Sequence, residues 1–198
     1  ATNVIVSKIP RPIFPGNINS EKPYRENATS VGGIVGYADK STLRRLFTQP
    51  SIYGRSTVGG IIGYASGTQV SDCGVKTETF NNGNNSAIMI GGIIGQASCS
   101  SHCEFSNLVN YSDITSGSNY IGGIFGSMVA GTSVKINKVV NLGKISATNN
   151  VGGIIGKTSG KDIEVYDAAN FGVIQGIAGD KECGVGGIAG TAEDAITI

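Results

Sequence analysis

The chain has 198 residues, with 15 Lys and Arg against 14 Asp and Glu, so its net charge is +1. This balance gives no basic face for nucleic acid, and no apolar run is long enough to predict membrane insertion or a signal peptide. The 25 Ile and 16 Val residues far outnumber the 4 Leu residues, which favours strands over helices. The composition therefore predicts an all-β protein.

Residues 1–30 are predicted to form a Pro-rich N-terminal arm that includes part of a coil. Val4, Val6 and then Ile18 align with apolar strand positions of the later repeats between residues 134 and 145. Asn27 starts a glycosylation sequon in this polar stretch. The arm is expected to lead into the repeats at the second half of a coil.

Residues 31–198 are organised by one Gly-rich hexapeptide, Val/Ile-Gly-Gly-Ile-x-Gly. Its six copies start 27 to 34 residues apart, at Val31, Val58, Ile90, Ile121, Val151 and Val185. A unit of about 30 residues with short strands cannot bury its apolar face alone, so the copies must stack. The repeat predicts a parallel β-solenoid, or β-helix, of about six coils.

The paired glycines of the hexapeptide are predicted to be structural. They are expected to allow tight corners, positive φ angles and close approach of backbone between coils. The twelve residues concerned are Gly32, Gly33, Gly59, Gly60, Gly91, Gly92, Gly122, Gly123, Gly152, Gly153, Gly186 and Gly187.

A second pattern lies between the hexapeptides: two apolar residues separated by two others, often followed by Asn and an Ile four positions later. Examples are Phe105-Ser-Asn-Leu108 and Ile136-Asn-Lys-Val139. Stacking in register predicts a ladder of Asn110, Asn141 and Asn170. Asn110 also starts a sequon, but a ladder position would make its amide unavailable.

The hexapeptide, followed by a small-residue turn and a strand such as Val70-Ser-Asp-Cys73, resembles the GLUG motif. That motif occurs in extracellular microbial proteins, including non-catalytic regions of IgA-specific metallopeptidases and adhesin-like surface proteins. The resemblance covers residues 31 to 190, with Ile where the family name implies Leu. It implies a β-solenoid that is secreted or on a cell surface, and it transfers no catalytic residue.

The chain offers few candidates for chemistry. His102 is the one histidine, within Cys99-Ser-Ser-His-Cys103, and a metal held there with Cys73 is weighed against simple packing or oxidation of the cysteines. A disulfide is expected either between Cys99 and Cys103 or between Cys73 and one of them, in an oxidising compartment. Glu164 and Asp167 fit outer-face charges better than a glycosidase pair. We therefore predict no enzyme, metal or cofactor.

The two ends of the array carry the functional prediction. Residues 195–198 align with 162–165, so the sequence starts and stops at about the same phase of the repeat. Ile196 and Ile198 of one copy are expected to lie beside Val4 and Val6 of the next in a head-to-tail filament. A fragment of a longer array is the competing explanation of this phase.

The leading function is a non-catalytic structural protomer of a secreted or cell-surface fibre, whose partner is the protein itself. The alternative is an adhesin stalk that presents loops, such as residues 79–87, to a glycan or a host protein. Asn84, in the same stretch, starts a further sequon. A solenoid enzyme acting on glycans is the least favoured class.

Overall fold

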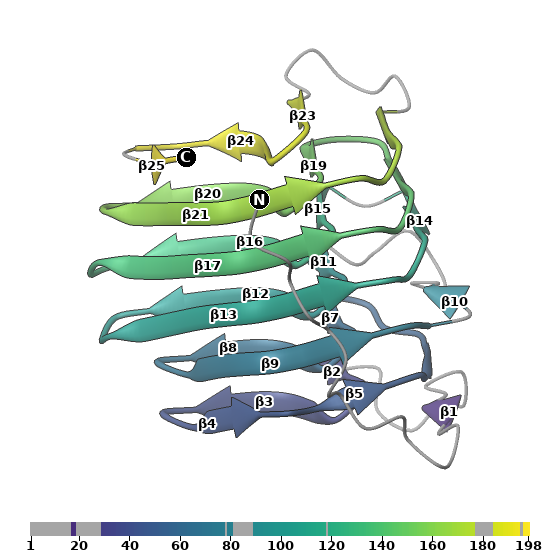
Figure 1. Cartoon of the computed structure of the whole chain (residues 1–198). Coiled ribbons are helices and arrows are strands. Elements are labelled where there is room, and N and C mark those ends of the chain that lie inside the picture. The colour runs from purple at the N-terminus through teal and green to yellow at the C-terminus, as the bar shows by residue number, and fades with distance from the viewer. Residues whose placement is uncertain are drawn as a thin grey trace.

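The computed structural model describes residues 17–18, 29–77, 79–80, 89–117, 119–176, 184–194 and 196–198. These residues form β-strands, turns and bends, and none of them is helical. The described chain accordingly has no helix that is long and apolar enough to cross a membrane. All the strand pairs are parallel, and the coils are stacked in layers (Figure 1). The predicted parallel β-solenoid is confirmed.

Each hexapeptide contributes one short strand to each of two adjacent sheets. The first hexapeptide sheet contains β2 (Ser30–Gly32), β7 (Thr57–Gly59), β11 (Met89–Gly91), β15 (Tyr120–Gly122), β19 (Val151–Gly152) and β23 (Val185–Gly186). The second hexapeptide sheet contains β3 (Val35–Asp39), β8 (Ile62–Ser66), β12 (Ile94–Cys99), β16 (Phe125–Ala130), β20 (Ile155–Gly160) and β24 (Ala189–Ala192). Six hexapeptides in one register correspond to about five turns of the solenoid.

The pattern between the hexapeptides forms the longest strands. This long-strand sheet contains β4 (Thr42–Arg44), β5 (Phe47–Thr48), β9 (Gln69–Val75), β13 (Cys103–Asn110), β17 (Val134–Asn141), β21 (Ile163–Asn170) and β25 (Ile196–Thr197). The fourth side, the return side, consists of β1 (Asn17–Ile18), β6 (Ser51–Ile52) and β10 (Thr79–Phe80), then β14 (Ile114–Ser116), β18 (Ile145–Ala147) and β22 (Ile174–Gly176).

The register of the strands agrees with the alignment of the repeats. Ile163 pairs with Ile196 and Glu164 with Thr197, as the alignment of residues 195–198 with 162–165 predicts. On the return side, β1 pairs with β6, which places residue 18 in the column that contains Ile52. Residues 1–16 and 19–28 lie outside the described residues, so the N-terminal arm stays a prediction.

The core consists of columns of aliphatic side chains in two clusters. The larger cluster lies between the second hexapeptide sheet and the long strands, and the smaller one lies between the first hexapeptide sheet and the return side. At the fourth hexapeptide position, Ile61, Ile93, Ile124 and Ile154 are fully buried. Burial of one such side chain stabilises by about 1.5–3 kcal/mol, so stacking of coils provides the core that one coil lacks.

Candidate assembly interface

The corner between the two hexapeptide sheets is a place where coils touch through backbone alone. A Cβ atom added to Gly122 would lie 2.7 Å from the amide nitrogen of Gly156 in the next coil. A Cβ atom added to Gly156 would lie 2.5 Å from the amide nitrogen of Ile121 and 2.6 Å from the carbonyl oxygen of Gly126, both in the coil below. Side chains do not fit at these distances, so the glycines set the stacking distance at this corner.

One part of the glycine prediction is wrong. In the described residues, positive φ among glycines occurs at Gly67, in the bend after β8, and at Gly160, the last residue of β20, and not in any hexapeptide. The hexapeptide glycines therefore do not depend on left-handed backbone. Apart from Gly187, they are required because a carbonyl oxygen, an amide or a side chain occupies the space that a Cβ atom would take.

The second glycine of the pair packs against the predicted Asn ladder. A Cβ atom on Gly92 would lie 2.6 Å from Cγ of Asn110, and one on Gly123 would lie 2.5 Å from Cγ of Asn141. In the coil before the ladder, Val75 takes the Asn position and faces Gly60 in the same way. The glycine column and the Asn column thus form one interlocked unit.

The three asparagines are hydrogen bonded along the solenoid axis. Asn110 Nδ2 donates to Asn141 Oδ1, and Asn141 Nδ2 donates to Asn170 Oδ1, each at 2.8 Å. Each amide also donates to the carbonyl two residues later, as from Asn141 to Gly143 at 2.8 Å. Asn110 and Asn141 are fully buried, so the sequon at Asn110 is inaccessible in the folded coil.

The long strands bend at a column that the sequence analysis did not identify. Its residues all have φ between about 50° and 56° and are Arg45, Asp72, Asn107, Lys138 and Asp167. They occupy the third position of the second pattern, where Asp and Asn are frequent because their side chains tolerate left-handed backbone. In this column Asn107 Nδ2 donates to Asp72 Oδ1 at 2.8 Å. The Asp and Asn residues at this position were the feature of the sequence from which the left-handed backbone could have been predicted.

The cysteines form a disulfide and one buried thiol. Cys99 is bonded to Cys103, with the two Cα atoms 5.8 Å apart across the turn that contains the exposed His102. Cys73 is fully buried in the core, and burial raises the pKa of its thiol to about 11. Within the described residues, no three His, Cys, Asp or Glu side chains are grouped so as to hold a metal ion.

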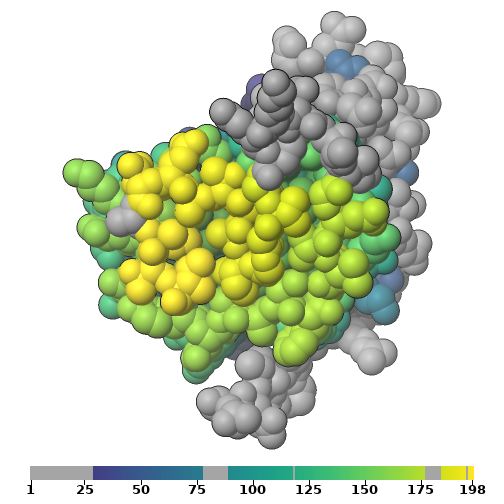
Figure 2. Space-filling model, turned by 90° about the horizontal axis from the view of Figure 1, so that it is seen from above, coloured from purple at the N-terminus to yellow at the C-terminus, as the bar shows by residue number. Residues whose placement is uncertain are grey.

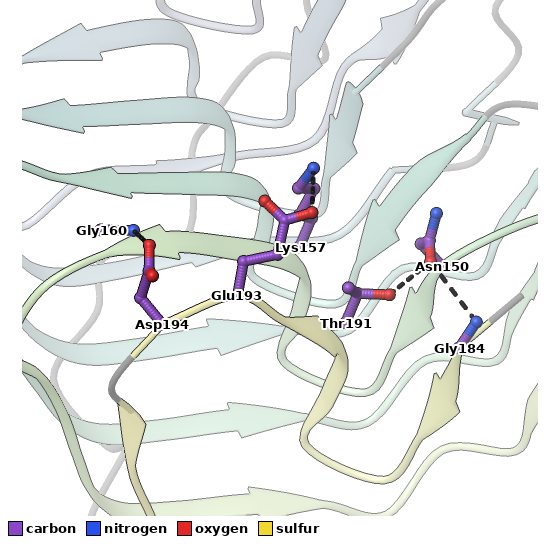
Figure 3. Close-up of polar contacts among 7 residues, drawn as sticks. All are labelled: Asn150, Lys157, Gly160, Gly184, Thr191, Glu193 and Asp194. Atoms are coloured by element: carbon purple, nitrogen blue, oxygen red, sulfur yellow. Dashed lines mark hydrogen bonds and ion pairs between the residues drawn. The ribbon is translucent and has the colours of Figure 1, made fainter. Parts of the chain in front are cut away.

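Residues 184–194 and 196–198, the upper coil, are joined to the coil below by polar contacts (Figure 3). Lys157 and Glu193 form an ion pair at 2.8 Å, and the amide of Gly160 donates to Asp194 Oδ2 at 3.1 Å. The hydrogen bond to Glu193 raises the pKa of Lys157. Asn150 Oδ1 accepts from the amide of Gly184 at 3.4 Å and also from Oγ1 of Thr191.

The upper coil leaves apolar side chains of the repeat uncovered. Figure 2 looks down on this face, where the residues after 183 are yellow. Val185 is 52% exposed, whereas Val151, one coil below in the same column, is fully buried. Ile198 is 66% exposed. A Cβ atom added to Gly187 would have no described atom within 4 Å, whereas the second hexapeptide glycine in each of the other five copies has close neighbours.

Residues 29–50, the lower coil, show the complementary exposure at the opposite end of the stack. Ile34 is 43% exposed although the equivalent isoleucines of the internal coils are fully buried. Tyr37 is exposed on one side and stacks on Tyr64 on the other, with ring centroids 5.3 Å apart. A Cβ atom on Gly36 would have only the Ser30 carbonyl oxygen, at 3.1 Å, among its described neighbours.

The structure brings some of the predicted site residues to one end and does not describe others. Ile196 and Ile198 lie in the upper coil, where Ile196 pairs with Ile163 of β21. Val4 and Val6, their predicted neighbours in a second copy, lie outside the described residues, as do Asn27 and Asn84. The predicted contact between the two pairs therefore stays a prediction.

Comparison of the chain with protein-family models, with curated proteins and with solved structures finds no match. The resemblance to the GLUG motif accordingly stays a prediction.

Proposed function

We propose that the protein is a non-catalytic structural protomer that acts outside the cell and assembles end to end into a fibre. The observation that carries this proposal is the pattern of burial in the hexapeptide columns. Columns that are fully buried in the internal coils become exposed at Val185 in the upper coil and at Ile34 in the lower coil. A second copy stacked on either face would extend the buried columns.

The apolar side chains exposed on the two faces support an association of this kind. Burial of apolar surface yields about 25 cal/mol per Å², so a few hundred Å² provides several kcal/mol, against which the cost of association must be set. Parallel pairing across the joint would also satisfy backbone groups at the sheet edges, which otherwise must be covered. A head-to-tail contact joins two different faces on two copies, and it builds an open filament when the rotation between copies does not close a ring.

The proposed location outside the cell rests on two observations. The Cys99–Cys103 disulfide is typical of proteins from oxidising compartments. The resemblance of the repeat to extracellular GLUG-type proteins points the same way. Mass spectrometry of unreduced peptides, from protein isolated from its native source, would detect the disulfide, and a free thiol at both positions would contradict this location.

Negative-stain electron microscopy and sedimentation velocity over a range of concentrations test the assembly. We expect short rods at low concentration and filaments, with a rising sedimentation coefficient, at high concentration. If the 198-residue chain stays monomeric at the highest concentration, the fibre proposal is wrong, and the adhesin stalk that presents loops to a glycan or host protein takes its place.

A further inference from the structure

Building on the end-to-end assembly proposed above, we propose that the joint keeps the register of the internal coils. In this joint, β23 and β24 of one copy pair with β2 and β3 of a second copy. The partner of the upper coil is therefore the lower coil of an identical chain, and the joint is one more turn of the same solenoid.

The sequence of sides around the solenoid continues across such a joint. The upper coil contributes strands to both hexapeptide sheets and to the long-strand sheet, in the order β23, β24, β25. The next side in chain order is the return side, and β1 is the strand at its lower end. β1 of the second copy thus lies on the side that follows β25 of the first, and β2, β3 and β4 come next in chain order.

The glycine corner provides the first specific contact of the joint. In the internal coils, the space beside the second glycine is occupied by the carbonyl oxygen of the second glycine in the coil above, as Gly187 occupies it for Gly153. Gly187 itself has no described neighbour there. In the joint, Gly33 of the second copy fills this space, and glycine at position 187 is required by the assembly rather than by the fold of one copy.

The lower coil provides the matching half of this contact. The last glycine of each higher coil packs on two backbone atoms of the coil below, as Gly190 packs on the amide of Val151 and the carbonyl oxygen of Gly156, both at 2.7 Å from an added Cβ. Gly36 has no such pair of atoms among its described neighbours. The amide of Val185 and the carbonyl oxygen of Gly190 in the first copy supply them.

Backbone hydrogen bonding follows the same rule. The amide of Gly153 donates to Gly186 O at 3.0 Å, and the amide of Ile154 donates to Ile188 O at 2.9 Å. One coil higher, the amides of Gly187 and Ile188 have no equivalent acceptor among the described residues. The carbonyl oxygens of the second copy's lower coil meet both amides in the joint.

The net charges of the two end coils favour a copy of this chain as the occupant over an unrelated apolar partner. The upper coil carries Glu193 and Asp194 and no positive residue, a charge of −2, of which Glu193 is paired with Lys157 in the coil below. The lower coil carries three positive residues, Lys40, Arg44 and Arg45, and one negative residue, a charge of +2. Opposite charges on the two faces favour the head-to-tail orientation and disfavour pairing of like ends.

The test uses two variants that each block one half of the joint in the full chain. Gly187→Val blocks the upper coil, and Gly36→Val blocks the lower coil. Sedimentation velocity and negative-stain microscopy are performed on each variant alone and on an equimolar mixture. Each variant alone is expected to be monomeric at concentrations where the wild type forms filaments. The mixture has one intact upper face and one intact lower face, so a dimer of twice the monomer mass and nothing larger is expected.

A second pair of variants guards against a failure of folding. Val185→Glu and Ile34→Glu place a charge on each face at side chains that are already half exposed. Far-UV circular dichroism must match the wild type for whichever pair is used. The same result is expected for this pair: monomers alone and dimers in the mixture.

The outcomes separate this inference from the function on which it rests. If the wild type and both variants all form filaments, the proposed register is wrong but end-to-end assembly stands. Dimers formed by a single variant overturn the head-to-tail joint in favour of a contact between like faces. A wild type that stays monomeric overturns both the register and the end-to-end assembly.

Discussion

The substitution Gly123→Ala tests whether the hexapeptide glycines are required by steric contact between coils. The added Cβ atom would lie 2.5 Å from Cγ and 2.6 Å from Oδ1 of Asn141, and it would also meet the carbonyl oxygen of Gly153. Overpacking of this kind costs about 1–3 kcal/mol. Displacement of Asn141 would also weaken its hydrogen bonds to Asn110 and Asn170, each of which contributes about 1 kcal/mol. We expect the free energy of unfolding to fall by about 3–5 kcal/mol.

Gly187→Ala is the matched control, because it lies at the same repeat position and has no described atom within 4 Å of the added Cβ. Neither glycine has a positive φ, so the two substitutions differ in steric contact and not in backbone strain. The control is expected to be neutral, or more stable by up to about 1 kcal/mol through loss of unfolded-state entropy. Urea unfolding at a concentration where the wild type is monomeric gives both values, and equal midpoints for the two variants would refute the steric argument.

Three further predictions concern the ladder, the upper coil and the disulfide. Asn141→Ala should lower the free energy of unfolding by about 2–4 kcal/mol, because it leaves buried partners unsatisfied, and thermal and urea unfolding would show it. Lys157 has a pKa above its ordinary 10.5 in the folded state, so the contribution of its pair with Glu193, at most about 1 kcal/mol, should be lost as the pH rises through that raised pKa. The protection factors of amides in β24, which are corrected for the base-catalysed rise of intrinsic exchange, should then fall at high pH in the wild type but not in Glu193→Gln. Reduction of Cys99–Cys103, which closes a short loop, should lower the free energy of unfolding by about 2 kcal/mol, whereas a chelator should leave the melting temperature unchanged.

The repeat made the register of the solenoid predictable from sequence. Because equivalent residues of similar repeats must stack, the alignment of the repeats put Phe105 opposite Ile136 and Asn110 opposite Asn141, and the strands pair in this way. It also placed Ile196 beside Ile163. A side chain in a stacked column has the same neighbours in every coil, so one alignment fixes many contacts at once.

Features that depend on local backbone geometry or on the ends were not predictable in the same way. Glycine in a repeat is compatible with both positive φ and close approach, and the sequence did not distinguish the two at Gly123. The contacts of Asn150, Lys157 and Asp194 with neighbouring coils involve turns of different lengths, whose geometry a repeat alignment does not specify. The lower coil was the hardest to anticipate, because its exposure depends on which strands lie beneath it.

The left-handed column of the long strands yields the last prediction. Lys138 is exposed and has φ of 54°, a conformation that costs residues other than Gly, Asn and Asp about 1–2 kcal/mol. Lys138→Gly removes this cost and should raise the free energy of unfolding. The gain is limited to about 1 kcal/mol because the greater entropy of Gly in the unfolded chain offsets part of it. Lys138→Val removes the same charge as Lys138→Gly but adds a β-branched side chain, for which left-handed backbone is a genuine outlier. It should therefore lower the free energy of unfolding by more than about 1 kcal/mol. Both variants remove the same lysine, and urea unfolding that gives them equal stability would show that the bend does not depend on the backbone conformation at residue 138.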